Sequence, residues 1–297
     1  MNQSPPFLFE RVAIIGIGLI GSSLAHALRQ NGLARKIVCA DANPEHVKKA
    51  VHLKIVDEAT RDNCAAVENA DLVILCTPIS SLSKIAAEIA PSLANGCIVS
   101  DVSSVKQAVI RDVGPSIPAH VHFIPAHPIA GTEHSGPEAG FAELFKGRWC
   151  ILTPLPGTDE KALKKLRTLW EVCGSMIEVM EPRHHDQVLA ITSHLPHLIA
   201  YTIVGTATDI AEDLKQEVIR YSASGFRDFT RIAASDPIMW RDIFLNNREA
   251  VLEVLQRFSE DLTALQRAIR WGEGDKLEEL FARTREIRRG IIKEKQA

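Results

Sequence analysis

The stretch VAIIGIGLIGSS, residues 12–23, places three glycines directly after an apolar run and at the start of an amphipathic one. This order predicts a buried strand, a tight turn and a helix. The first glycine permits the turn, the second lets the backbone approach a pyrophosphate, and the third lets the helix pack closely on the strand. The phosphates then lie at the helix N-terminus, where backbone N–H groups point at them. The stretch therefore predicts a dinucleotide-binding loop made of Gly16, Ile17, Gly18, Leu19, Ile20 and Gly21.

An acidic residue ends the next predicted strand. Asp41 closes the segment 36–41 and lies twenty residues beyond Gly21. A carboxylate at this point accepts hydrogen bonds from the ribose hydroxyls of NAD and repels the 2′-phosphate of NADP. The residues that follow, Ala42-Asn43-Pro44, include no arginine that could receive this phosphate. We therefore predict NAD as the cofactor, with NADP as the less favoured alternative.

The first half of the chain alternates apolar runs with amphipathic helical patterns. The candidate strands are residues 11–16, 36–41, 71–76, 97–101, 120–125 and 149–154. Their continuously apolar character is typical of parallel strands that are covered on both faces. The sequence therefore predicts an α/β fold with an N-terminal Rossmann-type parallel sheet. A further helix over residues 159–172 and a strand over 176–180 follow it.

Two of these strands are followed by small polar residues. Thr77 and Pro78 come after the run LVILC, and Ser103 and Ser104 come after CIVSD. The carboxyl ends of parallel strands form the edge where cofactor and substrate bind in open α/β sheets. We predict that Thr77, Pro78 and Ser103 contact the cofactor, while capping of the next helix is the alternative interpretation.

The second part of the chain has a different pattern, with no convincing strand after Pro182. Asp236-Pro237 is a typical helix start, and we expect one helix from there to about Trp271, before Gly272 and Gly274. A last helix is predicted over residues 275–295. These patterns predict two domains: a dinucleotide-binding domain over 1–182 and an all-helical substrate and dimerisation domain over 183–297.

Composition excludes several classes of protein. The 297 residues are 46% hydrophobic with a net charge of −3, so there is no basic surface that indicates nucleic-acid binding. No apolar run approaches the roughly 18 residues that span a bilayer, and the N-terminus has no secretory signal pattern. The six cysteines form no CxxC pair. We therefore expect reduced thiols in a cytoplasmic protein that binds neither nucleic acid nor membrane.

Residues with catalytic chemistry lie in both halves. His127, near the end of a predicted strand beside a nicotinamide, is placed to take a proton from a substrate hydroxyl; a structural histidine is the alternative. Arg231 lies in the apolar-flanked segment GFRDFTRIA and needs an anion. That anion is a substrate carboxylate, Asp228 or Asp236, and spacing alone does not separate them.

A histidine-rich segment raises the question of a metal. Ser193, His194 and His197 share a helical face, but no Cys, Asp or Glu completes a ligand set in sequence. His184 and His185 are neighbours whose side chains point apart. We therefore expect no metal site.

Six motifs taken together carry a family resemblance: GIGLIG, SSVK (103–106), HPIAGTE (127–133), SHLPH (193–197), SGFRDFTRIA (224–233) and DPIMWRDIF (236–244). In this order, from Val12 to about Arg270, the chain resembles the prephenate/arogenate dehydrogenases of tyrosine biosynthesis. The resemblance implies NAD-dependent oxidative decarboxylation of prephenate and/or arogenate, to 4-hydroxyphenylpyruvate and/or tyrosine.

The same resemblance implies roles for individual residues. His127 matches the catalytic histidine that binds the substrate 4-hydroxyl, and Ser104 matches the serine that assists it. The implied substrate-binding residues are Arg231, His197, Ser193, Thr132, Glu133 and Trp240. Arg231 matches the carboxylate-binding arginine, and Trp240 matches a tryptophan that reaches a neighbouring subunit's site.

Two other functions remain as alternatives. A β-hydroxyacid-type dehydrogenase has a similar plan but relies on a lysine of its helical domain. A non-catalytic NAD-sensing module would keep the glycines but has no need for His127 together with Arg231.

We also predict a homodimer formed through the helical half. A helix over residues 237–271 would be 35 residues, about 52 Å, long, which overshoots a compact domain of this size. Apolar residues recur along it at spacings of four and three: Val251, Leu255, Phe258, Leu262, Leu265 and Ile269. This pattern indicates a helix packed lengthwise against another. Coverage of this seam by the last helix of the same chain is the alternative.

Overall fold

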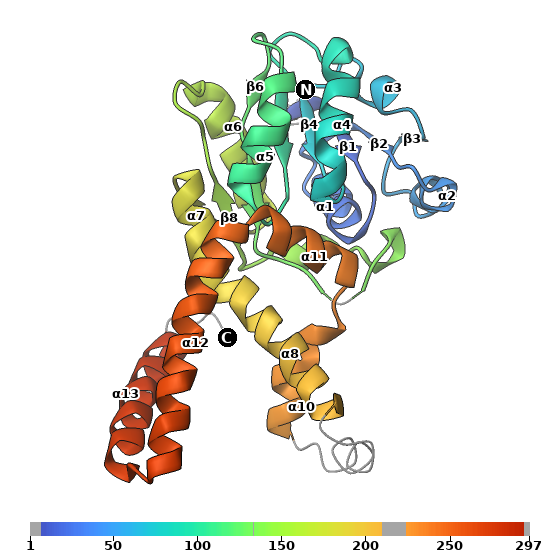
Figure 1. The fold of residues 1–297 in the computed structure, drawn as a ribbon. Helices are drawn as coiled ribbons and strands as arrows, with labels where there is room; N and C mark the ends of the chain where they lie inside the picture. Colours follow the sequence, from blue (N-terminus) through green and yellow to red (C-terminus); the bar gives the residue numbers. More distant parts are fainter. Residues whose placement is uncertain (1–6, 133, 210–223, 294–297) are drawn as a thin grey trace. The chain divides into compact units, whose positions relative to one another are not determined.

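A computed structural model describes residues 7–132, 134–209 and 224–293 of the chain. Contacts divide it into two compact units, Met1–Arg248 and Glu249–Ala297, which we describe separately. The first unit contains every strand of the described residues, and the second contains two helices (Figure 1).

A six-stranded parallel sheet forms the centre of the first unit. Its strands are β1 (Phe9–Ile15), β2 (Ala34–Ala40), β3 (Glu58–Thr60), β4 (Leu72–Leu75), β5 (Ile98–Asp101) and β6 (His122–Phe123). They lie in the order β3-β2-β1-β4-β5-β6, and every neighbouring pair is parallel. The predicted Rossmann-type parallel sheet is confirmed, with the short edge strand β3 as an addition.

Helices cover both faces of this sheet (Figure 1). They are α1 (Leu19–Gln30), α2 (Pro44–His52), α3 (Asn63–Val67), α4 (Ile79–Ile89), α5 (Lys106–Val113) and α6 (Glu160–Val172). Val12 and Ile14 of β1 join a core cluster with α1, α2 and α6, whereas Ala13 and Ile15 join a cluster with α3, α4 and α5. Burial of successive residues on opposite faces explains why these strands are continuously apolar.

The predicted strand over residues 149–154 does not belong to the parallel sheet, which corrects the sequence-based assignment. It forms β8 (Trp149–Leu152), which pairs antiparallel with β7 (Ala126–Pro128) and parallel with β9 (Met176–Val179). The predicted strand over 120–125 is also shorter than expected and forms only β6. Pro125 has no N–H to donate to a ladder, so the chain leaves the first sheet there and starts the second.

The rest of the first unit is helical within the described residues, as predicted. Its elements are α7 (Pro182–Leu189), the π-helical turn η5 (Ala190–His194), α8 (Leu195–Asp209), α10 (Ser224–Thr230), the 3-10 turn η6 (Arg231–Ala234) and α11 (Pro237–Asn246). The predicted start of α11 is confirmed, because the Asp236 side chain accepts a hydrogen bond from Met239 N at 2.7 Å.

The single helix predicted over residues 237–271 is wrong. The chain forms α11 and then α12 (Arg248–Trp271), with Asn247 between them at φ −106° and ψ 32°. The Asn247 side chain donates to the Asp186 carbonyl at 2.9 Å and lies 3.0 Å from His194 Nδ1. These buried bonds hold Asn247 at a position where a helical pattern alone predicts continuation.

Within the described residues, the second unit consists of α12 and α13 (Gly274–Lys293). Gly272, at φ +66°, ends α12, and Figure 1 shows α13 returning along it. With 24 residues, α12 is about 36 Å long rather than 52 Å. The predicted seam is partly covered within the chain: Val251 is buried and Leu255, Phe258 and Leu265 are half-buried, whereas Leu262 and Ile269 are 49% and 67% exposed.

Candidate active site

The glycine loop has the geometry that a bound dinucleotide needs. Gly16 has φ +94°, and a Cβ there would lie 2.8 Å from the Cys76 carbonyl oxygen. A Cβ on Gly21 would overlap the Gly16 carbonyl, so helix α1 could not approach the turn. Gly18 precedes α1 without a side-chain cap, and a Cβ there would meet no atom within 4 Å. The loop therefore leaves the N-terminus of α1 open to a ligand. Leu19 and Ile20 are the first two residues of this helix.

Asp41 follows β2 directly beside this loop, as predicted. Its carboxylate accepts hydrogen bonds from Ile17 N at 2.9 Å and from Asn43 N at 2.8 Å. His46 Nδ1 of α2 lies 3.3 Å from the same carboxylate. These contacts fix the Asp41 side chain at the carboxyl edge of the sheet, where a ribose would lie.

Two hydroxyl groups at this edge fit a polar ligand. Thr77 Oγ1 after β4 and Ser103 Oγ after β5 are buried, and neither has a partner among the described residues. Pro78 directly precedes α4. Because buried hydroxyls are normally hydrogen-bonded, these two and the open glycine loop fit the groups of a bound dinucleotide.

His127 lies within β7 rather than after a strand of the first sheet. It is 7% exposed, and its Nδ1 is 2.9 Å from Nε2 of His185 in α7. His185 Nδ1 is in turn 2.8 Å from Asp186 Oδ1. Sequence reasoning considered His185 only as a metal ligand and missed Asp186. The helix start at Pro182 was the available signal, since helical spacing places His185 and Leu189 on one buried face.

A fully buried ion pair positions the strand that carries His127. Lys106 Nζ donates to Asp101 Oδ2 and to the Ala126 carbonyl, each at 2.5 Å. Asp101 Oδ1 accepts a hydrogen bond from Ala126 N at 3.2 Å. Burial lowers the pKa of Lys106, and Asp101 opposes this shift. The Lys106–Asp101 ion pair therefore links β5, α5 and β7 at Ala126, the residue before His127.

The site keeps its histidines neutral. Burial is the main reason that the pKa of His127 lies well below its usual value, and His185, Lys106 and His194 lower it further. Burial likewise lowers the pKa of His194 to about 4. At neutral pH the unprotonated His127 is therefore able to act as a base.

The predicted residues His197 and Trp240 are in ring contact, and His194 makes a second ring contact with Trp240. His194 and Trp240 have ring centroids 6.0 Å apart, and the His197 ring stacks on Trp240 at 3.6 Å. Burial lowers the pKa of His197, and the nearby charge of Arg231 lowers it further. The ring contacts thus join His194, Trp240 and His197, while His127 and Arg231 are linked to this group through charge effects on the pKa values.

The remaining predicted residues are less closely gathered. Ser104 is half-buried in the loop between β5 and α5, and the Ser193 carbonyl accepts a hydrogen bond from His197 Nδ1 at 2.8 Å. Thr132 is exposed, and its hydroxyl accepts from His134 N at 3.2 Å. Glu133 lies outside the described residues. Trp240 is buried within its own chain beside Val105 and Ile243.

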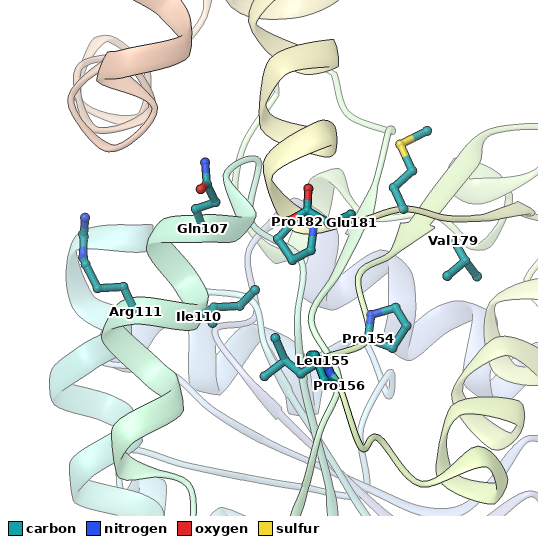
Figure 2. A pocket seen from close by; sticks show the side chains of 10 residues that line it. Gln107, Ile110, Arg111, Pro154, Leu155, Pro156, Val179, Glu181 and Pro182 are labelled. Carbon is teal, nitrogen blue, oxygen red and sulfur yellow. The ribbon is translucent and has the colours of Figure 1, made fainter.

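A surface hollow of about 730 Å³ lies apart from these residues. Figure 2 shows Gln107, Ile110 and Arg111 of α5 on one side and residues 154–156 opposite them. Val179 of β9 and Pro182 of α7 complete much of its rim (Figure 2). None of the predicted site residues lines this hollow.

A dinucleotide-binding loop on a parallel sheet, together with a buried neutral histidine, is the arrangement expected of a dinucleotide-dependent oxidoreductase. Comparison with known proteins identifies the family. The family description "Prephenate dehydrogenase, nucleotide-binding domain" matches residues 24–179, and "Prephenate dehydrogenase, dimerization domain" matches residues 181–283. The chain therefore belongs to the prephenate dehydrogenase family.

Individual relatives agree over nearly the whole chain. Cyclohexadienyl dehydrogenase of Zymomonas mobilis is 42% identical over 281 residues, which cover 95% of this chain and 96% of the relative. The crystal structure of prephenate dehydrogenase from A. aeolicus, in complex with hydroxyphenyl propionate and NAD+, is 37% identical with a TM-score of 0.89, covering 98% of this chain and 100% of that one. Synechocystis arogenate dehydrogenase is 30% identical with a TM-score of 0.81, covering 95% and 99%.

Proposed function

We propose that this protein catalyses NAD-dependent oxidative decarboxylation of prephenate and/or arogenate, yielding 4-hydroxyphenylpyruvate and/or tyrosine. The observation that carries the proposal is the buried, neutral His127 on β7, whose Nδ1 is committed to His185. The relatives named above, which are cyclohexadienyl, prephenate and arogenate dehydrogenases, support the same reaction. Family membership argues against a β-hydroxyacid-type dehydrogenase.

Each site residue has a separate task in this reaction. The glycine loop and Asp41 would hold NAD+, which would supply the acceptor for a hydride from C4 of the substrate ring. His127 takes the proton of the 4-hydroxyl, and Ser104 assists by hydrogen bonding to the same oxygen. Arg231 binds a substrate carboxylate, and His197 is a second substrate contact. The ring carboxylate leaves as CO2, and the ring becomes aromatic.

A turnover assay tests the proposal against a sensor. NADH or NADPH formation is measured with prephenate and with arogenate, each in the presence of NAD+ or NADP+. We expect turnover with at least one substrate and a preference for NAD+. An NAD-sensing module would bind the cofactor and produce no reduced form with either substrate, and this result would refute the proposal.

The preference for NAD over NADP is proposed to depend on Asp41. We expect Asp41→Ala to weaken NAD+ binding and to relax discrimination against NADP+, because the variant loses both the ribose acceptor and the charge that repels a 2′-phosphate. The measurement is kcat/KM for both cofactors at fixed substrate. Glu45→Ala, which removes an exposed carboxylate from the adjacent helix, is the control. An unchanged preference ratio in Asp41→Ala would remove Asp41 from cofactor selection.

The division at residue 182 is proposed to separate a dinucleotide-binding domain (1–182) from a substrate and dimerisation domain (183–297). The two family matches meet at residues 179 and 181, which supports this division. The compact units of the chain divide later, after Arg248. We also propose a cytoplasmic location, since all six cysteines are free thiols.

A homodimer through the helical half is supported by apolar surface. By length and composition alone the helical stretch Pro182–Ala207 is apolar enough to span a membrane, which the lack of a long uninterrupted apolar run in the sequence did not predict. In this stretch Ile191 is 58% exposed, and Leu195, Leu198, Ile199 and Ile203 are half-buried. In the second unit, Leu252, Leu262 and Ile269 of α12 are about half exposed or more. A match to a dimerization domain over residues 181–283 favours a second copy as the cover for these surfaces.

Charged substitutions on α12 should separate the subunits. We expect Phe258→Glu and Leu262→Glu to shift the mass seen by light scattering from about 65 kDa, twice 32.7 kDa, toward the monomer and to reduce activity. A carboxylate placed in an apolar interface is desolvated without a partner. Gln266→Glu adds the same charge at an exposed position of α12 and should change neither property. A fully active monomer would contradict the proposed dimer.

A further inference from the structure

The hydrogen bonds around His127 form a line of three polar side chains. His127 Nδ1 lies 2.9 Å from His185 Nε2, and His185 Nδ1 lies 2.8 Å from Asp186 Oδ1. His185 and Asp186 are fully buried, so neither exchanges these partners for bulk water. In such a chain of hydrogen bonds, a group that can only accept makes its neighbour the donor. The direction of each further hydrogen bond then follows.

Asp186 is that group. Its Oδ1 accepts a hydrogen bond from Lys106 N at 2.7 Å, and its Oδ2 accepts one from Gln107 N at 2.9 Å. These amides begin α5, where the helix dipole favours a negative charge. Burial raises the pKa of Asp186, but the bonds from His185 and the two amides outweigh it and keep this pKa below its usual range. The ionised carboxylate has no proton to give, so His185 Nδ1 must donate.

The protonation of His127 follows from that of His185. Burial lowers the pKa of His185 despite its bond to Asp186, so the ring is neutral and its Nε2 carries a lone pair. This nitrogen accepts from His127 Nδ1–H. The neutral His127 then has its own lone pair on Nε2.

Other titratable groups near His127 are occupied elsewhere. Lys106 Nζ donates to Asp101 and to the Ala126 carbonyl, and His194 Nδ1 faces the Asn247 amide. His185 is therefore the acceptor that the described structure provides for His127 Nδ1.

We propose that His185, held by Asp186, is a positioning residue that fixes His127 in the tautomer with its lone pair on Nε2. This inference rests on the proposed function, in which that nitrogen takes the proton from the substrate hydroxyl. The imidazolium that forms still donates Nδ1–H to His185, so the same bond also stabilises the protonated base. An aspartate orients the catalytic histidine of serine proteases in a comparable way.

Two substitutions of His185 separate positioning from mere packing. Leucine provides no acceptor, and we expect His185→Leu to lower kcat roughly 10²-fold, less than the ~10⁴-fold loss when a serine-protease histidine adopts the wrong tautomer. Glutamine can accept from His127 through Oε1 and donate to Asp186 through its amide. The charge of Asp186 selects this orientation of the amide. We therefore expect His185→Gln to retain kcat close to native.

The matched control is His184→Leu, which changes the exposed neighbour on the same helix and should leave kcat, both KM values and the melting temperature unchanged. In His185→Leu the KM for NAD+ should also stay close to native, because the loss lies in the chemical step. Equal losses in His185→Gln and His185→Leu would overturn the positioning role, since glutamine restores the hydrogen bonds but cannot carry a proton onward. Native kcat in a folded His185→Leu would overturn it as well.

Nitrogen NMR of the ligand-free protein tests the tautomer without any turnover. With labelled histidine, and with His127→Asn used to assign the signal, we expect an unprotonated Nε2 and a protonated Nδ1 on His127. The same pattern should persist in His185→Gln, a measurement that remains decisive if His185→Leu does not fold. A protonated Nε2 would overturn the inference. Because this readout needs no substrate, failure of the proposed reaction would be seen separately, as absent turnover with the expected tautomer intact.

Discussion

Replacing His127 with asparagine should lower kcat by roughly 10²–10⁴-fold, the usual contribution of a general base. Asparagine keeps a polar side chain of smaller size, but its amide cannot accept and hold a proton at neutral pH. Because the loss falls on the chemical step, the affinity for NAD+ should change little. Steady-state kinetics with prephenate and arogenate, together with NAD+ titration, provide the measurement. Near-native kcat in His127→Asn would remove this residue from the mechanism.

The pH dependence of the native enzyme is a second test of the role of His127. Burial lowers the pKa of His127 below the ~6.5 of an unperturbed imidazole, so the neutral base persists to lower pH than it would in an exposed histidine. The acid limb of kcat/KM should therefore lie below pH ~6.5, with activity lost as pH falls through it. His184→Asn, a change of an exposed histidine, should leave this limb in place.

The dinucleotide half of the site could be predicted because its constraints are local. A glycine at φ +94° and a glycine whose Cβ would overlap the backbone are required by the turn itself, so the sequence records them directly. The constraint on Asp41 is equally local, since this residue directly follows β2, the strand after the first strand–helix unit in sequence. Buried parallel strands are recognisable for the same reason, because each must be apolar on both faces.

The surroundings of His127 could not be predicted, because they depend on contacts between distant segments. His127 and His185 are 58 residues apart, and Asp186 meets the start of α5 across 80 residues. The antiparallel pairing of β7 with β8 also joins segments that no periodicity relates. Asn247 ends a helix through buried bonds to Asp186 and His194, so a pattern read along residues 237–271 alone predicts one helix where two form.

Arg231 should bind a substrate carboxylate, and Arg231→Ala should raise the KM for prephenate by roughly 10²-fold or more. Arg231 is exposed in the structure, so the expected loss is that of a charge pair desolvated only when a substrate covers it. Loss of one partner from such a desolvated, hydrogen-bonded pair costs about 2–5 kcal/mol, and each 1.4 kcal/mol is tenfold in affinity. The position supports this role, because the charge of Arg231 acts on His197, whose ring stacks on Trp240 at 3.6 Å. The affinity for NAD+ should stay close to native, since the glycine loop and Asp41 are unchanged.

Two further variants decide between a substrate contact and a structural ion pair. Arg227→Ala removes an exposed arginine one helical turn earlier and should leave the KM for prephenate within about twofold of native. Arg231→Lys keeps the charge but loses the planar, two-point contact with a carboxylate, so its KM should fall between those of native and Arg231→Ala. If Arg231→Ala weakens NAD+ and prephenate equally, or if it unfolds the protein, Arg231 serves the fold through Asp228, Asp236 or another internal partner. A selective loss of substrate affinity, graded from arginine to lysine to alanine, identifies the carboxylate as its ligand.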